Sequence, residues 1–93
     1  MDAEKLAALK RHCHIDFDDD DAQLLMLYGS AVGYLAGAGV PATMQEDERY
    51  LLAAYSLVNE WYDGAAIGTC TVGLRQLINQ LKMEQIASAG TGL

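Results

Sequence analysis

An all-α fold, a compact bundle of about four helices, is what this sequence predicts. Leu and Ala are abundant, Val and Ile are few, and the strict apolar–polar alternation of a half-buried strand is nearly absent. Apolar residues instead recur at intervals of three and four, the spacing of one helix face. We expect two long central helices, shorter N- and C-terminal helices, and room for a short extended piece in the loop 64–72.

The chain of 93 residues is long enough for one domain. We expect a single helical domain over residues 1–86, and a flexible tail in the small, glycine-bearing end at 87–93. A domain this short buries only about 60–65% of the surface of its unfolded chain, so its core is thin. Apolar residues still make up 52% of the sequence. We interpret this surplus as surface for contacts with other chains.

The first two helices are expected on either side of a short connector. The first spans about Asp2–His12 with Asp2 as its N-cap, and the connector brings Ile15 and Phe17 to the core. The second spans about Asp18–Ala38 and begins in a run of aspartates that suits the positive end of the helix dipole. One of them can cap free backbone N–H groups, and the others form a solvated surface or an acidic partner patch. The run consists of Asp18, Asp19, Asp20 and Asp21.

The second helix is apolar on two faces, and three glycines recur along it at intervals of four residues. Each glycine in a helix costs about 0.5–1 kcal/mol relative to alanine. A close backbone crossing would explain them, and it is expected either within the chain or between subunits. The expected helix-packing or subunit interface consists of Leu25, Gly29, Val32, Gly33 and Gly37.

The stretch 22–45 contains no charged residue, which raises the alternative of a membrane helix. Its glycines, Pro41 and polar side chains dilute the apolar character, and its flanks are acidic where membrane anchors are usually basic. About 17 residues precede the helix-breaking end, which is the lower limit for a span. We therefore expect a tightly packed helix and no membrane.

Two further helices complete the predicted bundle. The third is expected from about Glu46 to Asp63, where Gly64 ends it, and the fourth from about Val72 to Gln85. Apolar and aromatic positions that share one face are expected to anchor the core. These anchors are Leu24, Tyr28, Tyr34, Leu51, Tyr55, Val58, Trp61, Tyr62, Leu77, Ile78 and Leu81.

The acidic run matches a calcium-binding helix–loop–helix loop only in part. Asp16, Asp18 and Asp20 stand at the first three ligand positions of such a loop. Asp21 then occupies the position that needs glycine, and Leu27 the position that needs a bidentate glutamate. No calcium site is expected.

The segment His12–His14 offers potential metal ligands but no complete set. A closed zinc site needs four ligands, and only Cys70 and acidic residues remain to complete one. Cys13 beside two histidines is not thereby a catalytic pair, because neighbours in sequence are not necessarily aligned in space. No nucleophile-elbow or phosphate-loop motif is present. We expect no enzyme, no metal and no cofactor, and two reduced cysteines, with one disulfide as the alternative.

The charge balance narrows the range of partners. Six basic residues face thirteen acidic ones, which gives a formal net charge of −7, and Lys10 and Arg11 are the only adjacent basic pair. Nucleic-acid-binding proteins normally carry a basic patch that releases counterions from the phosphates. Sequence-specific binding of DNA or RNA is therefore not expected, and an anionic membrane surface is disfavoured for the same reason.

A series of weak landmarks over residues 2–83 follows the order and spacing of a known family. The sequence resembles the small head–tail connector (adaptor) proteins of tailed phages, which also occur in prophages and gene-transfer particles. The landmarks are Leu6 to Lys10, Ile15, the acidic run from Asp16 to Asp21, Leu24, Ala31, Tyr34, Leu35, Ala53, Ala54, Leu57, Trp61 to Asp63, Val72, Gly73, Leu77, Ile78, Leu81 and Lys82.

The resemblance implies a structural protein of the virion. Such proteins form a homo-oligomeric ring between the portal protein and the tail completion or stopper protein, around the channel through which DNA leaves. DNA would pass without sequence-specific binding. The protein would lie at the head–tail interface of the virion, and in the cytoplasm of the bacterial host during assembly. The alternative is a generic homo-oligomeric, partner-binding helical protein of non-viral origin.

Overall fold

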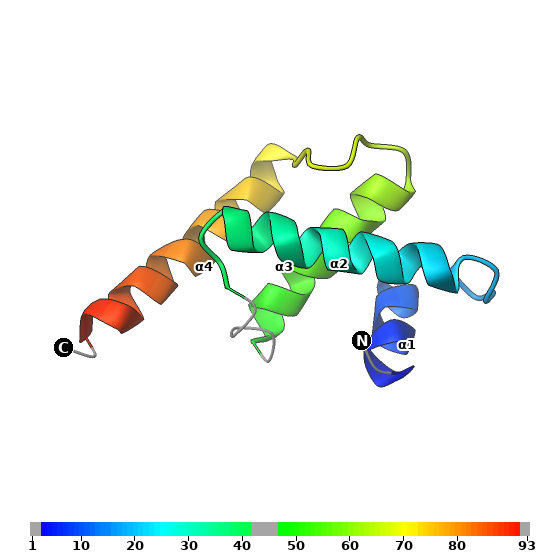
Figure 1. Ribbon diagram of the computed structural model, residues 1–93, viewed down its shortest axis with the longest axis horizontal. Helices are drawn as coiled ribbons and strands as arrows, with labels where there is room; N and C mark the ends of the chain where they lie inside the picture. The colour runs from blue at the N-terminus through cyan, green and yellow to red at the C-terminus, as the bar shows by residue number, and fades with distance from the viewer. Residues whose placement is uncertain (1–2, 42–46, 92–93) are drawn as a thin grey trace.

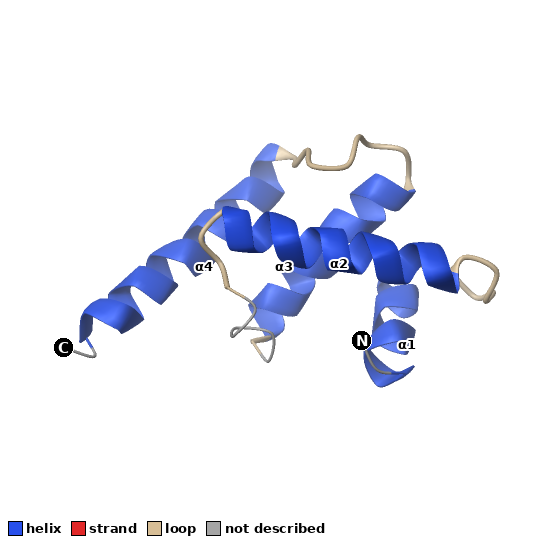
Figure 2. Cartoon of the chain, in the orientation of Figure 1, coloured by secondary structure: helices blue, strands red, loops and turns tan. Residues whose placement is uncertain are grey.

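Four α-helices make up the computed structural model, which describes residues 3–41 and 47–91 (Figure 1, Figure 2). Neither of these ranges contains a strand, so the predicted all-α class with four helices is confirmed. The loop between the last two helices forms turns in place of the extended piece that the sequence allowed. In chain order, α1 spans Ala3–His12, α2 spans Asp21–Gly37, α3 spans Glu48–Tyr62 and α4 spans Val72–Thr91.

Helix α3 is the centre of the fold, because α1, α2 and α4 all contact it. Tyr50 and Leu57, which were not among the expected anchors, are fully buried, so buried side chains cover more of the circumference of α3 than predicted. The expectation that α2 is also central is wrong, since α2 buries only one face in the chain. The buried residues of α3 are Tyr50, Ala53, Ala54, Tyr55, Leu57, Val58 and Trp61.

Helix α2 lies across α3 on the side nearer the viewer in Figure 1. Its inward face follows helical spacing and brings Tyr28 to Tyr55, with ring centres 6.1 Å apart. Near its other end, the ring of Tyr34 meets Trp61 edge-on at 5.9 Å. The buried residues of α2 are Leu24, Leu27, Tyr28, Ala31 and Leu35.

Helix α4 is the longest of the four and not one of the shorter ones. It continues to Thr91, so the expected tail is helical over residues 87–91, and residues 92–93 lie outside the described part. Its buried side chains are Leu74, Ile78 and Leu81. The C-terminal half of α4 projects beyond the other helices in Figure 1. The molecule is accordingly elongated, with principal extents of 47 × 26 × 17 Å.

The helix starts differ in detail from the expected ones. Helix α2 begins at Asp21 and not at Asp18. Helix α3 begins after Asp47, whose side chain accepts a hydrogen bond of 2.8 Å from the backbone N–H of Arg49. The expected cap Asp2 and the expected start of the third helix at Glu46 lie outside the described residues.

The expected core anchors lie at two depths. Leu24, Tyr28, Tyr55, Val58, Trp61, Ile78 and Leu81 are buried, whereas Tyr34, Leu51, Tyr62 and Leu77 are partly buried and pack against the core. In the connector, Ile15 is buried, but Phe17 is 49% exposed, so its expected place in the core is wrong. The remaining apolar residues of the core outside α3 are Leu9, Leu27, Ala31, Leu35, Val40 and Leu74.

Candidate functional site

The side of α2 that faces away from α3 carries no charge. We call it the outer face of α2. Its apolar side chains stand in solvent, with Leu25 41% and Met26 75% exposed, and Val32 is half-buried at its edge. The spacing places these exposed positions on one side of the helix, opposite the buried set. The outer face consists of Ala22, Leu25, Met26, Gly29, Ser30, Gly33, Ala36 and Gly37, all of them exposed.

The three glycines of the outer face have no neighbour inside the chain. A Cβ atom built on Gly29, Gly33 or Gly37 meets nothing within 4 Å. A close helix crossing within the chain is therefore not the reason for these glycines. The structure leaves the outer face as an uncovered, uncharged surface, and a crossing between subunits is the alternative that still applies to it.

The acidic run is tied into the fold by its side chains and does not cap α2. The ammonium group of Lys10 lies 2.5 Å from Asp18 Oδ1 and 2.9 Å from Asp21 Oδ1. Asp20 stands at the N-cap position without a capping hydrogen bond, and it accepts a hydrogen bond from the phenol of Tyr62. These contacts connect the turn before α2 to α1 and to the end of α3.

The ion pair at this turn shifts the pKa values of Lys10 and Asp18. The hydrogen bonds from Lys10 to Asp18 and Asp21 raise the pKa of the lysine. The same bond lowers the pKa of Asp18 below its usual 3.8. Asp16 and Asp19 remain exposed beside this cluster. The acidic run therefore contains paired and unpaired carboxylates at one end of α2.

The histidines and cysteines do not converge on one site. The ring of His12 lies 6.1 Å from that of Tyr55, while His14 is exposed with φ 59°. Cys13 and Cys70 are both free thiols. Burial is the main cause that raises the pKa of each thiol, which disfavours the reactive thiolate. Among the described residues, no group of three or more His, Cys, Asp or Glu could hold a metal ion.

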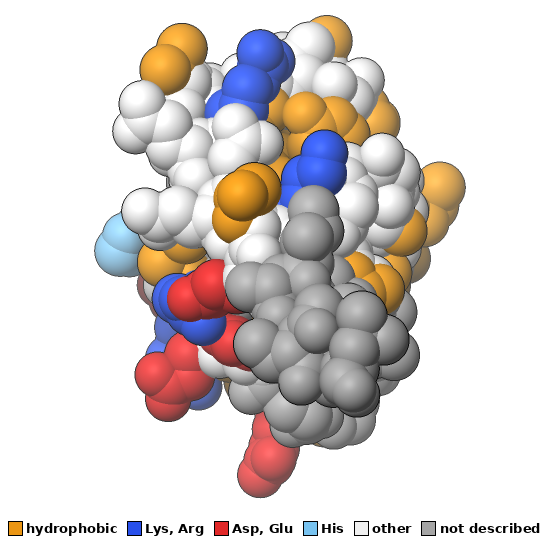
Figure 3. Space-filling model, turned by 90° about the vertical axis from the view of Figure 1, so that its left-hand side faces the viewer, with side chains coloured by type: hydrophobic (Ala, Val, Ile, Leu, Met, Phe, Trp, Pro, Cys, Tyr) orange, Lys and Arg blue, Asp and Glu red, His pale blue; other side chains and the backbone are white. Residues whose placement is uncertain are grey.

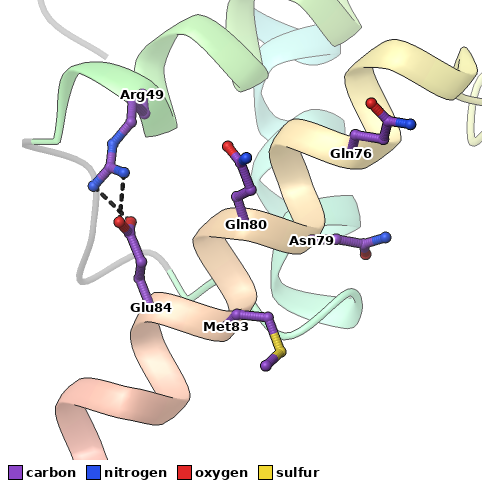
Figure 4. Close-up of a pocket in the computed structure, with 6 residues that line it drawn as sticks. All are labelled: Arg49, Gln76, Asn79, Gln80, Met83 and Glu84. Carbon is purple, nitrogen blue, oxygen red and sulfur yellow. Dashed lines mark hydrogen bonds and ion pairs between the residues drawn. The ribbon is translucent and has the colours of Figure 1, made fainter.

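A groove on α4, which the sequence did not reveal, opens beside the start of α3 (Figure 4). Its volume is about 750 Å³. Arg49 crosses it and pairs with both carboxylate oxygens of Glu84, through Nη1 and Nη2, at 2.6 Å each. The guanidinium also pairs with Asp47 at 3.3 Å. The charges of this groove are thus neutralised within it, and its lining is Arg49, Gln76, Asn79, Gln80, Met83 and Glu84.

No helix in the described ranges is long and apolar enough to cross a membrane. No protein-family model, no curated protein and no solved structure matches the chain.

Proposed function

We propose that this protein is a structural head–tail connector of a tailed phage or prophage. It forms a homo-oligomeric ring between the portal protein and the tail completion protein, around the channel through which DNA leaves. The proposal combines the resemblance of the sequence to this family with the outer face of α2. It assigns the protein no reaction, no cofactor and no membrane.

The observation that carries the proposal is the uncovered outer face of α2. A small domain gains stability by burying such a surface against another copy, because Leu25 and Met26 leave water on docking. The glycines let a neighbouring backbone come close, since they present no Cβ atom. An uncharged face also suits self-association of a chain with a net charge of −7, because like charges do not meet there.

Ring closure requires a head-to-tail contact between two different patches of the chain. The outer face of α2 supplies one of these patches in our proposal. The groove on α4 is a candidate for the other, since its exposed amides and Met83 could accept a neighbouring helix. The negative charge, repeated around such a ring, would repel phosphates and let DNA pass without sticking.

Electron microscopy of the full chain tests the proposal, alone and mixed with the portal protein encoded in the same genome region. We expect rings, or density for this protein bound to the portal. A variant with Gly33→Leu places a large side chain on the outer face and should prevent both. A protein that neither forms rings nor binds the portal would contradict the proposal, and self-association without portal binding would favour the non-viral alternative.

A further inference from the structure

Helix α1 is held to the rest of the fold by a small apolar contact. Its main neighbour is α3, and among residues 3–12 only Leu9 is buried. Leu6 and Ala8 are partly buried where they pack against the core. By comparison, α2 and α3 each bury at least five residues. Because burial of apolar surface is the main stabilising contribution, we expect α1 to be attached more weakly than α2 and α3.

The turn that ends α1 contains a strained residue. The backbone N–H of Ile15 donates to the carbonyl of Lys10 at 2.8 Å. The N–H of His14 donates to the carbonyl of Arg11 at 3.2 Å. These two bonds form a Schellman motif, in which the residue at the position of His14 is left-handed and usually glycine. His14 has φ 59°, and it is the only non-glycine residue with a positive φ in the described ranges.

After His14 the chain is tied to the rest of the fold. Ile15 is buried in the core, and Asp20 accepts the hydrogen bond from Tyr62 at the end of α3. Helix α2 begins at the next residue, Asp21. His14 therefore lies between a weakly attached helix and a firmly attached turn, which is the place for a hinge.

An ion pair spans this hinge but holds it weakly. The ammonium group of Lys10, before the hinge, contacts Asp18 and Asp21, after it, at 2.5 and 2.9 Å. The side chain of Asp18 is 87% exposed, and ion pairs in contact with water contribute little to stability. On the other side of α1, the ring of His12 lies 6.1 Å from that of Tyr55.

We infer that α1 detaches from α3 as one unit, by a change of backbone conformation at His14, while α2, α3 and α4 stay folded. A helix of ten residues is too short to be stable alone in water, so α1 unwinds when it leaves. Its departure uncovers Tyr55, whose ring also contacts Tyr28 of α2. The fold thus has a second apolar surface, in addition to the outer face of α2, that is open only in this state. The inference concerns the single chain and goes beyond the proposed function.

Helices α3 and α4 are joined by contacts in which α1 takes no part. Ile78 of α4 is buried, and Arg49 pairs with both carboxylate oxygens of Glu84 at 2.6 Å each. Figure 3 views the molecule from the end opposite α1, where acidic and basic side chains lie against one another. These contacts persist when α1 detaches, so a substitution among them should affect global unfolding and not the detachment.

Amide hydrogen exchange of the full chain, followed by NMR in increasing urea, tests the detachment. The amides of residues 7–13 are those hydrogen-bonded within α1. We expect them to share one protection factor, at least about tenfold below that of the slowest α3 amides, with a weak dependence on urea because little surface opens. Protection and urea dependence equal to those of α3 would overturn the inference. A steady gradient of protection from residue 7 to residue 13 would also overturn it, because that pattern describes fraying.

Two variants at His14, whose side chain is exposed, test the hinge. His14→Gly relieves the left-handed strain and should raise the protection factors of α1 by about threefold to tenfold. His14→Val should lower them by a similar factor, because β-branched residues avoid a positive φ. Unchanged protection of α1 in both variants would contradict a hinge at this residue.

Ile78→Val distinguishes detachment of α1 from unfolding of the whole chain. Loss of one buried methylene should lower the protection factors of the slowest α3 amides by about threefold to tenfold and leave those of α1 unchanged. The matched variant Lys10→Met removes the ion pair across the hinge and should lower the protection of α1 by about twofold to threefold. Parallel losses in α1 and α3 in Ile78→Val would show that α1 opens only when the whole chain unfolds, and would overturn the inference.

Discussion

The phenol of Tyr62 donates a hydrogen bond to a carboxylate oxygen of Asp20, which lies 42 residues earlier in the chain. This contact ties the end of α3 to the turn that starts α2. It is also the main cause that raises the pKa of Tyr62. Lys10 of α1 pairs with Asp18 and Asp21 at the same turn. The acidic run therefore connects α1, α2 and α3.

Tyr62→Phe removes the donor of this hydrogen bond and keeps the ring that packs against the core. We expect a small decrease in the free energy of unfolding, measured in urea by circular dichroism. The decrease should disappear when the same change is made in an Asp20→Ala background, because the pair no longer exists there. Equal decreases in both backgrounds would mean that the contact contributes nothing.

The ion pair at the junction predicts how stability depends on acid. Pairing with Lys10 lowers the pKa of Asp18 in the folded state. Its stabilisation is therefore present above the usual aspartate pKa of 3.8 and is lost as the pH falls through the lower folded-state value. Thermal unfolding between about pH 2 and pH 7 should show a shallower acid loss in Lys10→Ala than in the wild type. Hydrogen bonds from Arg49 also lower the pKa of Asp47, and they are present in both proteins. Part of the loss of stability in acid should therefore remain in Lys10→Ala.

Gly29→Ala tests how this glycine affects the stability of the single chain, apart from any effect on association. The new Cβ meets open space on the outer face, so alanine should raise the free energy of unfolding of the single chain by about 0.5–1 kcal/mol. Urea unfolding at a concentration where the chain is monomeric provides the measurement. A large destabilisation would mean that the glycine is covered within the chain.

Gly39→Ala is expected to act in the opposite direction. This glycine has φ +96°, and its Cβ would lie 3.1 Å from Lys82 Cγ. The left-handed conformation alone costs a side chain about 1–2 kcal/mol. The same variant in a Lys82→Ala background removes the side-chain contact, so the loss that persists there measures the backbone strain. Stability equal to the wild type would contradict a left-handed turn at this position.

Tyr50→Phe should leave the fold as stable as the wild type or raise its free energy of unfolding by about 1 kcal/mol. The hydroxyl of Tyr50 is buried without a hydrogen-bond partner among the described residues, and burial raises its pKa to about 12. Because burial raises the folded-state pKa above the usual value of 10.0, the wild type should lose stability relative to the variant as the pH rises from 10 toward 12. Alkaline unfolding of the wild type and the variant, followed by circular dichroism, checks the direction. A marked destabilisation of the variant at neutral pH would reveal a partner for the hydroxyl.

The helical fold and most of its core could be predicted because both leave a local pattern. The spacing of Leu24, Tyr28 and Leu35, and of Val58 and Trp61, places the members of each set on one face of a helix. Phe17 was misplaced because no periodic pattern governs a connector, and an apolar residue there has no fixed direction. The groove beside Arg49 and Glu84 could not be foreseen, since its partners are 35 residues apart and carry no local signal.

The sequence alone therefore determined the all-α class, four helices, the glycine spacing in α2 and the absence of charge over residues 22–45. Only the tertiary structure decided that α3 is central, that the acidic run binds Lys10 and Tyr62, and that Gly29, Gly33 and Gly37 are open to solvent. The physical reason is that helical periodicity depends on neighbours three and four residues away. Which face a helix buries, and against what, depends on contacts between segments that are distant in the chain.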